Sequence, residues 1–361
     1  MGPGLGLTRR ALLAGAAAIA AKPGWADAGG PAWLSAALRG RDDWRLIGLR
    51  PDGGVAFDLA LPGRGHAAAA HPAAPLAVAF ARRPGAFALV IDCAEGVERA
   101  RLTAPPERAF SGHGAFSADG ALLFSGENAH DLGRGRIGVW DATDWRRIGE
   151  FDSGGIGPHE ILRAPDGASL IVANGGILTH PDSGRQKLNL PTMRPNLARL
   201  RMGDGALIET VEPEPALRLN SLRHLAVAPD GTVAVAAQWQ GDLRAAPPLA
   251  ALWRPGAEGL DWLGAPEAPL LRMRGYAGSV AIARDGTRLV ATGPRGGLAL
   301  VFDIARGFKR AVEAADVCGA APAGDGFALT DGAGRVLTLG DGSAKPLGRI
   351  DGALDNHLVA L

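Results

Sequence analysis

Histidine is the residue with the most unusual placement in this sequence. Five of the eight histidines stand at one position of a repeated pattern, about six or seven residues before a turn: His66, His113, His159, His224 and His357. Ser279 and the Cys318-Gly319 pair hold the two other positions of this column, although seven positions taken at random would hold fewer than one histidine. Neutral imidazole is the commonest side-chain ligand of transition metals, so the column predicts a site for Fe, Cu or Zn and not for Ca or Mg.

The sequence around each histidine predicts short β-strands. An alternating apolar run leads to an Asp-Gly turn and a second β-rich run at 113–120, 159–167, 224–231 and 279–286, with degenerate copies at 66–72 and 318–326. Asp-Gly between two such runs predicts a β-hairpin. A third apolar strand and a more polar fourth strand follow each hairpin. Four strands per unit, repeated at this spacing, are typical of the blades of a β-propeller.

The repeats predict an all-β protein with a single seven-bladed β-propeller over residues 29–361. The last unit starts at His357 and the sequence ends at Leu361. Its innermost strand is expected to pair with N-terminal strands at 33–38, 44–49 and 55–61. That pairing would close the ring and leave no exposed sheet edge. Two insertions, 175–196 and 240–248, are expected between the second and third strands of the units of His159 and His224.

Residues 1–28 are predicted to be a twin-arginine export signal. Arg9 and Arg10 precede an apolar run of about eleven residues, and Ala26-Asp27-Ala28 is a small-x-small cleavage site. The run is shorter than the roughly 20 residues that a membrane span needs, so an integral membrane protein is not expected. We therefore expect a mature chain that starts near Gly29 and acts in the periplasm.

The innermost strands of a propeller start at the same face, so the five imidazoles are expected to ring one mouth of the central channel. The ends of the second strands return to that face, and they and the neighbours of the histidines supply further candidates for contact with a bound ligand. These candidates are Arg83, Glu127, Asn128, Glu160, Asn174, Arg223, Gln238 and Arg295. Carboxylates there would orient imidazoles, and arginines would select an anionic metal complex. Cys318 is a further candidate, as a soft ligand.

Three functions remain open from the residues alone. The ring of histidines suits a non-catalytic binding protein for a metal ion or metal complex, a metal-dependent oxidoreductase or lactonase-like hydrolase, or a metal-free scaffold for protein interactions. A calcium-dependent lactonase needs hard oxygen ligands, which Glu127, Asn128 and Asn174 supply only in part. With 38 Lys plus Arg against 37 Asp plus Glu, the chain lacks the basic footprint of a nucleic-acid-binding protein. A monomer is expected.

Two longer motifs resemble a known family. They are Gly155-Ile-Gly-Pro-His159-Glu160 and Asn174-Gly-Gly-Ile-Leu-Thr-His180-Pro-Asp182. With the order of the other histidine motifs, they are similar to the twin-arginine-exported bacterial propellers of the domain of unknown function (DUF) family 1513. Trp140 and Trp239 stand where the family would have tyrosine. No activity is established for the family. Its members tend to be encoded beside imelysin-type periplasmic iron-regulated proteins, so the resemblance implies an iron-related setting and an imelysin-type partner.

Overall fold

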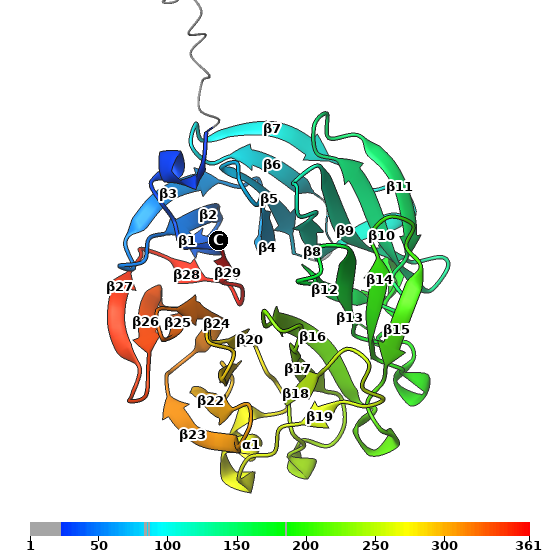
Figure 1. Cartoon of the computed structure of the whole chain (residues 1–361), viewed down its shortest axis with the longest axis vertical. Helices are drawn as coiled ribbons and strands as arrows, with labels where there is room; N and C mark the ends of the chain where they lie inside the picture. Colours follow the sequence, from blue (N-terminus) through cyan, green and yellow to red (C-terminus); the bar gives the residue numbers. More distant parts are fainter. Residues whose placement is uncertain (1–22, 83–84, 86, 185) are drawn as a thin grey trace, which may run out of the picture.

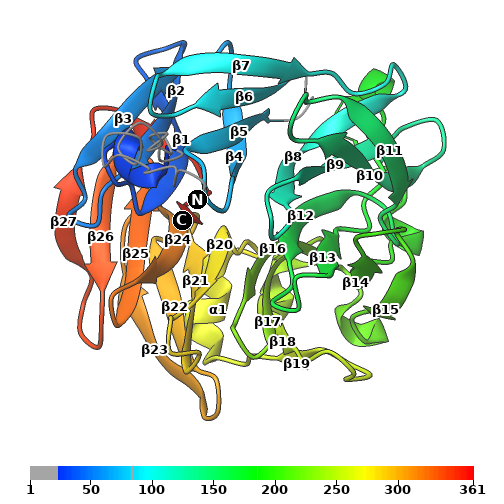
Figure 2. The ribbon, with the colours of Figure 1, turned by 45° about the horizontal axis from the view of Figure 1, so that its top comes forward.

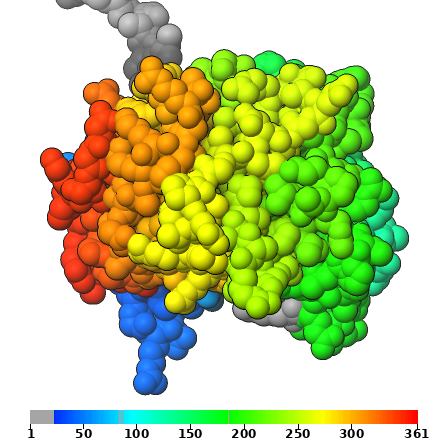
Figure 3. All heavy atoms as spheres, turned by 90° about the horizontal axis from the view of Figure 1, so that it is seen from below, coloured from blue at the N-terminus to red at the C-terminus, as the bar shows by residue number. Residues whose placement is uncertain are grey.

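The computed structural model of the chain describes residues 23–82, 85, 87–184 and 186–361. Seven antiparallel sheets form a ring around a central axis, which confirms the predicted all-β, seven-bladed propeller (Figure 1). Six sheets each use four consecutive strands. Figure 2 shows their first strands around the centre, and Figure 3 shows the blades edge-on. We number the blades along the chain, and blade 1 is the sheet that includes the C-terminal strands.

Blades 2–7 follow one another without crossovers. Blade 2 contains β4 (Gly65–Ala70), β5 (Leu76–Ala81), β6 (Ala88–Asp92) and β7 (Val97–Leu102). Blade 3 contains β8 (Arg108–Phe116), β9 (Leu122–Ala129), β10 (Arg134–Asp141) and β11 (Arg147–Asp152). Blade 4 contains β12 (Pro158–Arg163), β13 (Ser169–Asn174), β14 (Asn196–Arg201) and β15 (Leu207–Val211).

The remaining three complete blades have the same order. Blade 5 contains β16 (Asn220–Val227), β17 (Val233–Trp239), β18 (Ala250–Trp253) and β19 (Asp261–Trp262). Blade 6 contains β20 (Ser279–Ile282), β21 (Arg288–Gly293), β22 (Leu298–Asp303) and β23 (Gly307–Glu313). Blade 7 contains β24 (Val317–Ala323), β25 (Gly326–Asp331), β26 (Arg335–Leu339) and β27 (Lys345–Arg349).

Blade 1 joins the two ends of the propeller. Its N-terminal part is β1 (Trp33–Arg39), β2 (Asp43–Leu49) and β3 (Val55–Ala60). Its innermost position is shared by two short strands, β28 (Ala353–Leu354) and β29 (Val359–Ala360), which both pair with β1. Residues 355–358 between them, here called the closing segment, leave the sheet. The innermost strand is therefore split, and His357 lies in the closing segment instead of opening one continuous strand.

Helices are few and short. The α-helix α1 (Glu267–Met273) connects blades 5 and 6. The 3-10 helices are η1 (Trp25–Ala28), η2 (Pro181–Ser183), η3 (Leu190–Thr192), η4 (Pro215–Leu217) and η5 (Leu243–Ala245). Both predicted insertions connect second and third strands, in blades 4 and 5. Lys187 Nζ donates a hydrogen bond to Gln240 Oε1 (2.5 Å), so the two insertions touch.

The turns and the core explain why these repeats form sheets. Gly120, Gly167, Gly231 and Gly286 of the Asp-Gly turns all have positive φ, a conformation that favours glycine. Apolar side chains of neighbouring sheets pack between the blades, and β13 is buried along its whole length. The innermost strands therefore stand on a rigid frame. Within the described part of the chain, no helix is long and apolar enough to cross a membrane.

Candidate metal centre

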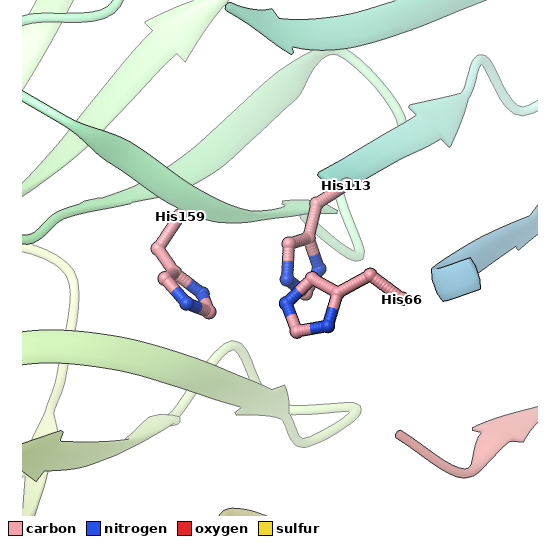
Figure 4. Close-up of side chains that lie close together, drawn as sticks. All are labelled: His66, His113 and His159. Carbon is pink, nitrogen blue, oxygen red and sulfur yellow. The ribbon is translucent and has the colours of Figure 1, made fainter. Parts of the chain in front are cut away.

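The five predicted histidines meet at the axis of the propeller, where each is at most 8% exposed. Successive blades bring neighbouring rings together: the centroid distances are 5.0 Å for His66 and His113, 4.8 Å for His113 and His159, and 4.7 Å for His159 and His224. His357 reaches in from the closing segment, 4.3 Å from His66 and 4.6 Å from His224. We call these five residues the histidine cluster. Figure 4 shows three of them converging.

β-Bulges in the innermost strands aim the histidines at the axis. The pairing register shifts between Gly65 and Ala68, Phe110 and Gly114, Pro158 and Ile161, and Leu222 and His224. A bulge inserts an extra residue into one strand and turns its side chain. Gly112 lies in one of them with φ +103°, and a Cβ there would stand 2.5 Å from His66 Cδ2. Glycine thus lets the ring of His66 lie against blade 3.

The cluster contains overlapping sets of three ligand atoms within 4.8 Å of one another. One set is His66, His113 and His159, and a second is His113, His224 and His357. His66 Nε2 and His357 Nε2 are 3.2 Å apart. Metal–nitrogen bonds of about 2.0–2.1 Å put neighbouring ligand atoms roughly 3–4 Å apart, so the distance between His66 and His357 fits a shared metal.

Burial favours the neutral form, which can bind a metal, in three imidazoles of the cluster. Removal from water lowers the pKa of His66, and burial with the nearby imidazoles lowers the pKa of His159 and His357 well below the usual value. Among the described residues, His159 Nδ1 is buried and has no hydrogen-bond partner. A buried nitrogen without a partner is costly, and coordination of a metal would satisfy it.

Asp355 is a functional candidate that the sequence analysis missed. Its Oδ1 lies 3.4 Å from His66 Nδ1, and its Oδ2 lies 3.2 Å from Arg64 Nη2 and 3.6 Å from Arg82 Nη1. Burial opposes ionisation, but the His66 imidazole and the charge of Arg82 hold the pKa of Asp355 well below its usual range. A carboxylate on the second nitrogen of an imidazole orients metal ligands. Its place two residues before His357 was the available signal.

Glu160, a predicted site residue, lies beside two imidazoles of the cluster. Its Oε2 accepts a hydrogen bond from Leu225 N (2.7 Å) and lies 3.5 Å from His224 Nδ1, and its Oε1 lies 3.9 Å from His113 Nδ1. One carboxylate thus faces two imidazoles. Arg223, only 8% exposed, occupies the bulge before His224, and its charge contributes to the lowered pKa of His159.

Two other predicted residues make their contacts within the blades. Glu127 is fully buried and accepts two hydrogen bonds from Arg147 (2.6 and 3.0 Å) and one from Ser125 (2.9 Å). The Asn174 amide donates to Ser153 O (2.8 Å) and Asn196 Oδ1 (2.9 Å). Their expected place at the mouth is thus replaced by structural roles, because the side chains of strand ends can turn into the sheet packing.

The remaining predicted residues are Arg295, Gln238, Asn128 and Arg83. Arg295 lies over the ring of Tyr276, 4.2 Å from its centroid, and Gln238 pairs with Tyr276 through the backbone. Tyr276, the single tyrosine, accepts a hydrogen bond from Asn356 Nδ2 (3.0 Å), and the sequence analysis missed it. Asn128 is buried in β9. Arg83 lies outside the described residues.

Cys318 packs against the closing segment. Its Sγ lies 3.4 Å from Thr330 O and 3.5 Å from Asp355 O, and burial raises the pKa of the thiol to about 12. Metals bind the thiolate, so these contacts do not favour the predicted role as a soft ligand. Cys93 and Cys318 are both free.

Comparison with known proteins agrees with the fold and the motifs. Among solved structures, a chain described as Kuenenia stuttgartiensis Hydrazine Synthase aligns with TM-score 0.62 and 13% identity, over 90% of this chain and 98% of that chain. At this identity the likeness shows the fold alone. No curated protein matches the chain. Residues 59–361 match the family model described as "Protein of unknown function (DUF1513)". The chain therefore belongs to the DUF1513 family, as its motifs predicted.

Proposed function

We propose that this protein is a periplasmic, non-catalytic binding protein that holds a transition metal at the histidine cluster. The observation that carries the proposal is the presence of two overlapping sets of three imidazoles, buried and with their ligand atoms within 4.8 Å. Neutral nitrogen donors suit Fe, Cu and Zn, whereas Ca and Mg prefer oxygen ligands. The iron-related setting that the family resemblance implies favours iron among them.

The carboxylates support this proposal because each faces imidazoles of the cluster. Asp355 lies beside His66, and Glu160 lies between His113 and His224. In metal sites such contacts fix the tautomer of the ring and point its second nitrogen at the metal.

The proposed location and partner rest on sequence features. Arg9, Arg10 and the apolar run after them support export by the twin-arginine pathway, which carries folded proteins. Folding before export would let the cell choose the metal in the cytoplasm. An imelysin-type protein of the periplasm is the proposed partner, and a monomer is the proposed state of the chain.

Metal content tests the proposal. The full chain is expressed with its native signal and without a metal-binding tag, purified from the periplasm and measured by mass spectrometry of the elements. We expect close to one Fe, Cu or Zn per chain and its loss in a His113→Ala/His159→Ala variant with unchanged circular dichroism. His180→Ala, which changes a histidine outside the cluster, serves as the control. A metal-free wild-type protein under metal-replete conditions would favour an interaction scaffold instead.

A further inference from the structure

The charged residues around the histidine cluster include more cations than anions. Asp355 is paired with two arginines, Arg64 (3.2 Å) and Arg82 (3.6 Å). Arg223 adds a third guanidinium, and Glu160 is the second carboxylate that contacts the cluster. These five charged side chains beside the cluster therefore carry three positive and two negative charges.

This balance disfavours a bare metal ion. Placing a divalent or trivalent cation in a buried site costs free energy unless opposite charge accompanies it, because the low dielectric of the interior screens little. Imidazoles contribute no charge, and Asp355 is already neutralised by Arg64 and Arg82. A metal that arrives with an anionic ligand carries a smaller net charge.

The arginines also offer free hydrogen-bond donors beside the cluster. Within the described part of the chain, the Arg82 guanidinium makes the ion pair with Asp355 and no hydrogen bond to a protein acceptor, and its side chain is 32% exposed. Arg64 is 47% exposed and lies over the ring of Trp44. A cavity of about 130 Å³ lies beside this ion pair and is lined by Trp44, Arg64 and Asp355, among others. Paired guanidinium groups bind carboxylates well.

We propose that the histidine cluster takes up its metal as a complex with a small carboxylate chelator, whose free carboxylate is bound by Arg64 and Arg82. This inference rests on the proposed metal binding and names the chemical class of the ligand. The imidazoles would replace some of the chelator's oxygen atoms on the metal, and the remaining ones would stay bound. The metal and the chelator would then be retained together.

Retention of two labels tests this inference. Metal-free full-length protein is incubated with Fe(III), Cu(II) or Zn(II), with and without ¹⁴C-citrate as the probe, and passed through a desalting column. We expect about one citrate retained per metal, and at least a tenfold weaker retention of both labels in Arg64→Gln/Arg82→Gln. Arg101→Gln, which removes an exposed arginine of the outer strand β7, is the matched control.

The outcomes separate this inference from the proposed function. Metal retained equally well without citrate, or without its citrate label, would overturn the inference and leave metal binding intact. Failure to retain any of the three metals, with or without citrate, would overturn both. Citrate retained equally in the absence of metal would also overturn the inference, because the arginines would then bind the anion independently of the cluster.

A separate observation concerns the N-terminal boundary of the mature protein. The turn η1 is packed on the propeller: Trp25 Nε1 donates to His71 O (3.0 Å), and Ala28 is 5% exposed in a core cluster with Leu34 and Leu46. Gly29 N and Gly30 N donate to Ala26 O and Trp25 O (both 3.1 Å). The expected cleavage site at Ala26-Asp27-Ala28 is therefore part of a closed turn.

We infer that the signal is removed before Pro23 and that η1 stays in the mature protein. This rests on the proposed twin-arginine export, because such a protein reaches the signal peptidase already folded. A peptidase needs an extended and accessible backbone, and the turn after Gly24 would first have to unfold locally. The sequence offers another small-x-small site, Ala18-Ile19-Ala20, outside the described residues.

The mass of the intact periplasmic protein tests this boundary. We expect a first residue before Pro23, and we expect Trp25→Ala to lower the melting temperature of the periplasmic protein by several degrees because it removes a packed side chain. A chain that starts at Gly29, whose stability Trp25→Ala cannot affect, would overturn the inference. An uncleaved chain would overturn it as well, together with the proposed export.

Discussion

Blades 2–5 and blades 6–7 use the same position of their innermost strands in two ways. In blades 2–5 a bulge turns an imidazole toward the axis. In blade 6, Ser279 pairs with Thr292 in a regular register, without a bulge. In blade 7 a bulge is present, but it carries Cys318 and Gly319. Two neighbouring positions of the column thus lack the imidazole that the others supply.

The closing segment explains the difference for blade 7. A Cβ on Gly319 would stand 3.2 Å from Leu358 Cβ, 3.4 Å from Leu358 N and 2.3 Å from Thr330 Oγ1, and Cys318 Sγ contacts the carbonyl oxygens of Leu354 and Asp355. Blade 7 therefore seats the segment that carries Asp355 and His357. The small size of Cys318 and Gly319 has a structural role, because it lets the imidazole of His357 reach the cluster.

The largest expected effect is on a ligand of blades 2–5. His113 belongs to both sets of three imidazoles, so His113→Ala should lower metal affinity at least about 100-fold. Ser279→Ala, the matching change in blade 6, should leave the affinity within about twofold of the wild type, because Ser279 brings no imidazole to the cluster. Competition with a chromophoric chelator measures both constants. Equal losses of metal affinity in the two variants would contradict the difference proposed between blades 2–5 and blade 6.

Asp355 tests whether the closing segment orients the cluster as well as supplying His357. Asp355→Asn should lower metal affinity by about 10- to 100-fold, because the carboxylate no longer holds the ring of His66. The same competition assay gives the value, and Asp351→Asn is the nearby control. An unchanged metal affinity in Asp355→Asn would mean that Asp355 does not orient His66 and only forms ion pairs with Arg64 and Arg82.

Gly319 tests whether the closing segment depends on its packing against blade 7. Gly319→Ala should lower the free energy of unfolding by about 1–3 kcal/mol, because its Cβ meets Thr330 and Leu358 in a packed region. Gly340→Ala is the control, since a Cβ there has no neighbour within 4 Å. Urea unfolding of the metal-free proteins measures the difference. If the two variants were equally stable, blade 7 would not depend on the small size of Gly319.

The smallest expected effect per residue is the contribution of each buried histidine to the pH dependence of stability. The unfolded chain binds protons on histidine below about pH 6.5, whereas burial lowers the pKa of His66, His159 and His357 in the folded chain. The unfolded state then binds more protons, so stability is complete above pH 6.5 and falls as the pH is lowered toward 5.5. The loss is about 1 kcal/mol for each of these histidines.

Urea unfolding of the metal-free protein at pH 7.5, 6.5 and 5.5 measures this dependence. In a His66→Gln/His159→Gln variant, the decrease in stability that the three histidines cause between pH 7.5 and pH 5.5 should be about two thirds smaller. His180→Gln changes a partly exposed histidine outside the cluster and is the control. An identical slope in the cluster variant and the wild type would mean that the imidazoles of the cluster are protonated in the folded chain.

The fold was predictable because short sequence patterns define each repeat. Asp-Gly turns and alternating strands recur in most blades, five of the seven column positions are histidine, and local rules connect these signals to hairpins. The split of the innermost strand of blade 1 was not predictable in this way. It depends on how residues 355–358 pack against Gly319, a contact between segments that no periodicity reveals.

The site was predictable in part for a similar reason. The column identified the imidazoles, but the bulges that aim them depend on strand pairing and not on residue type. Glu127 and Glu160 illustrate the limit. Both follow the expected pattern for the mouth, yet Glu127 pairs with Arg147 of the outer strand β11, whereas Glu160 faces two imidazoles. The direction of a side chain near a bulge is decided by its tertiary partners.

X-ray absorption at the metal edge tests the central claim most directly. The protein is purified from the periplasm with its own metal, and the first coordination shell is measured. The account predicts three or four nitrogen ligands at about 2.0–2.1 Å with the outer-shell scattering of imidazole, and the loss of that signal in His113→Ala/His159→Ala. A shell of oxygen without imidazole, or sulfur at about 2.3 Å, would contradict it.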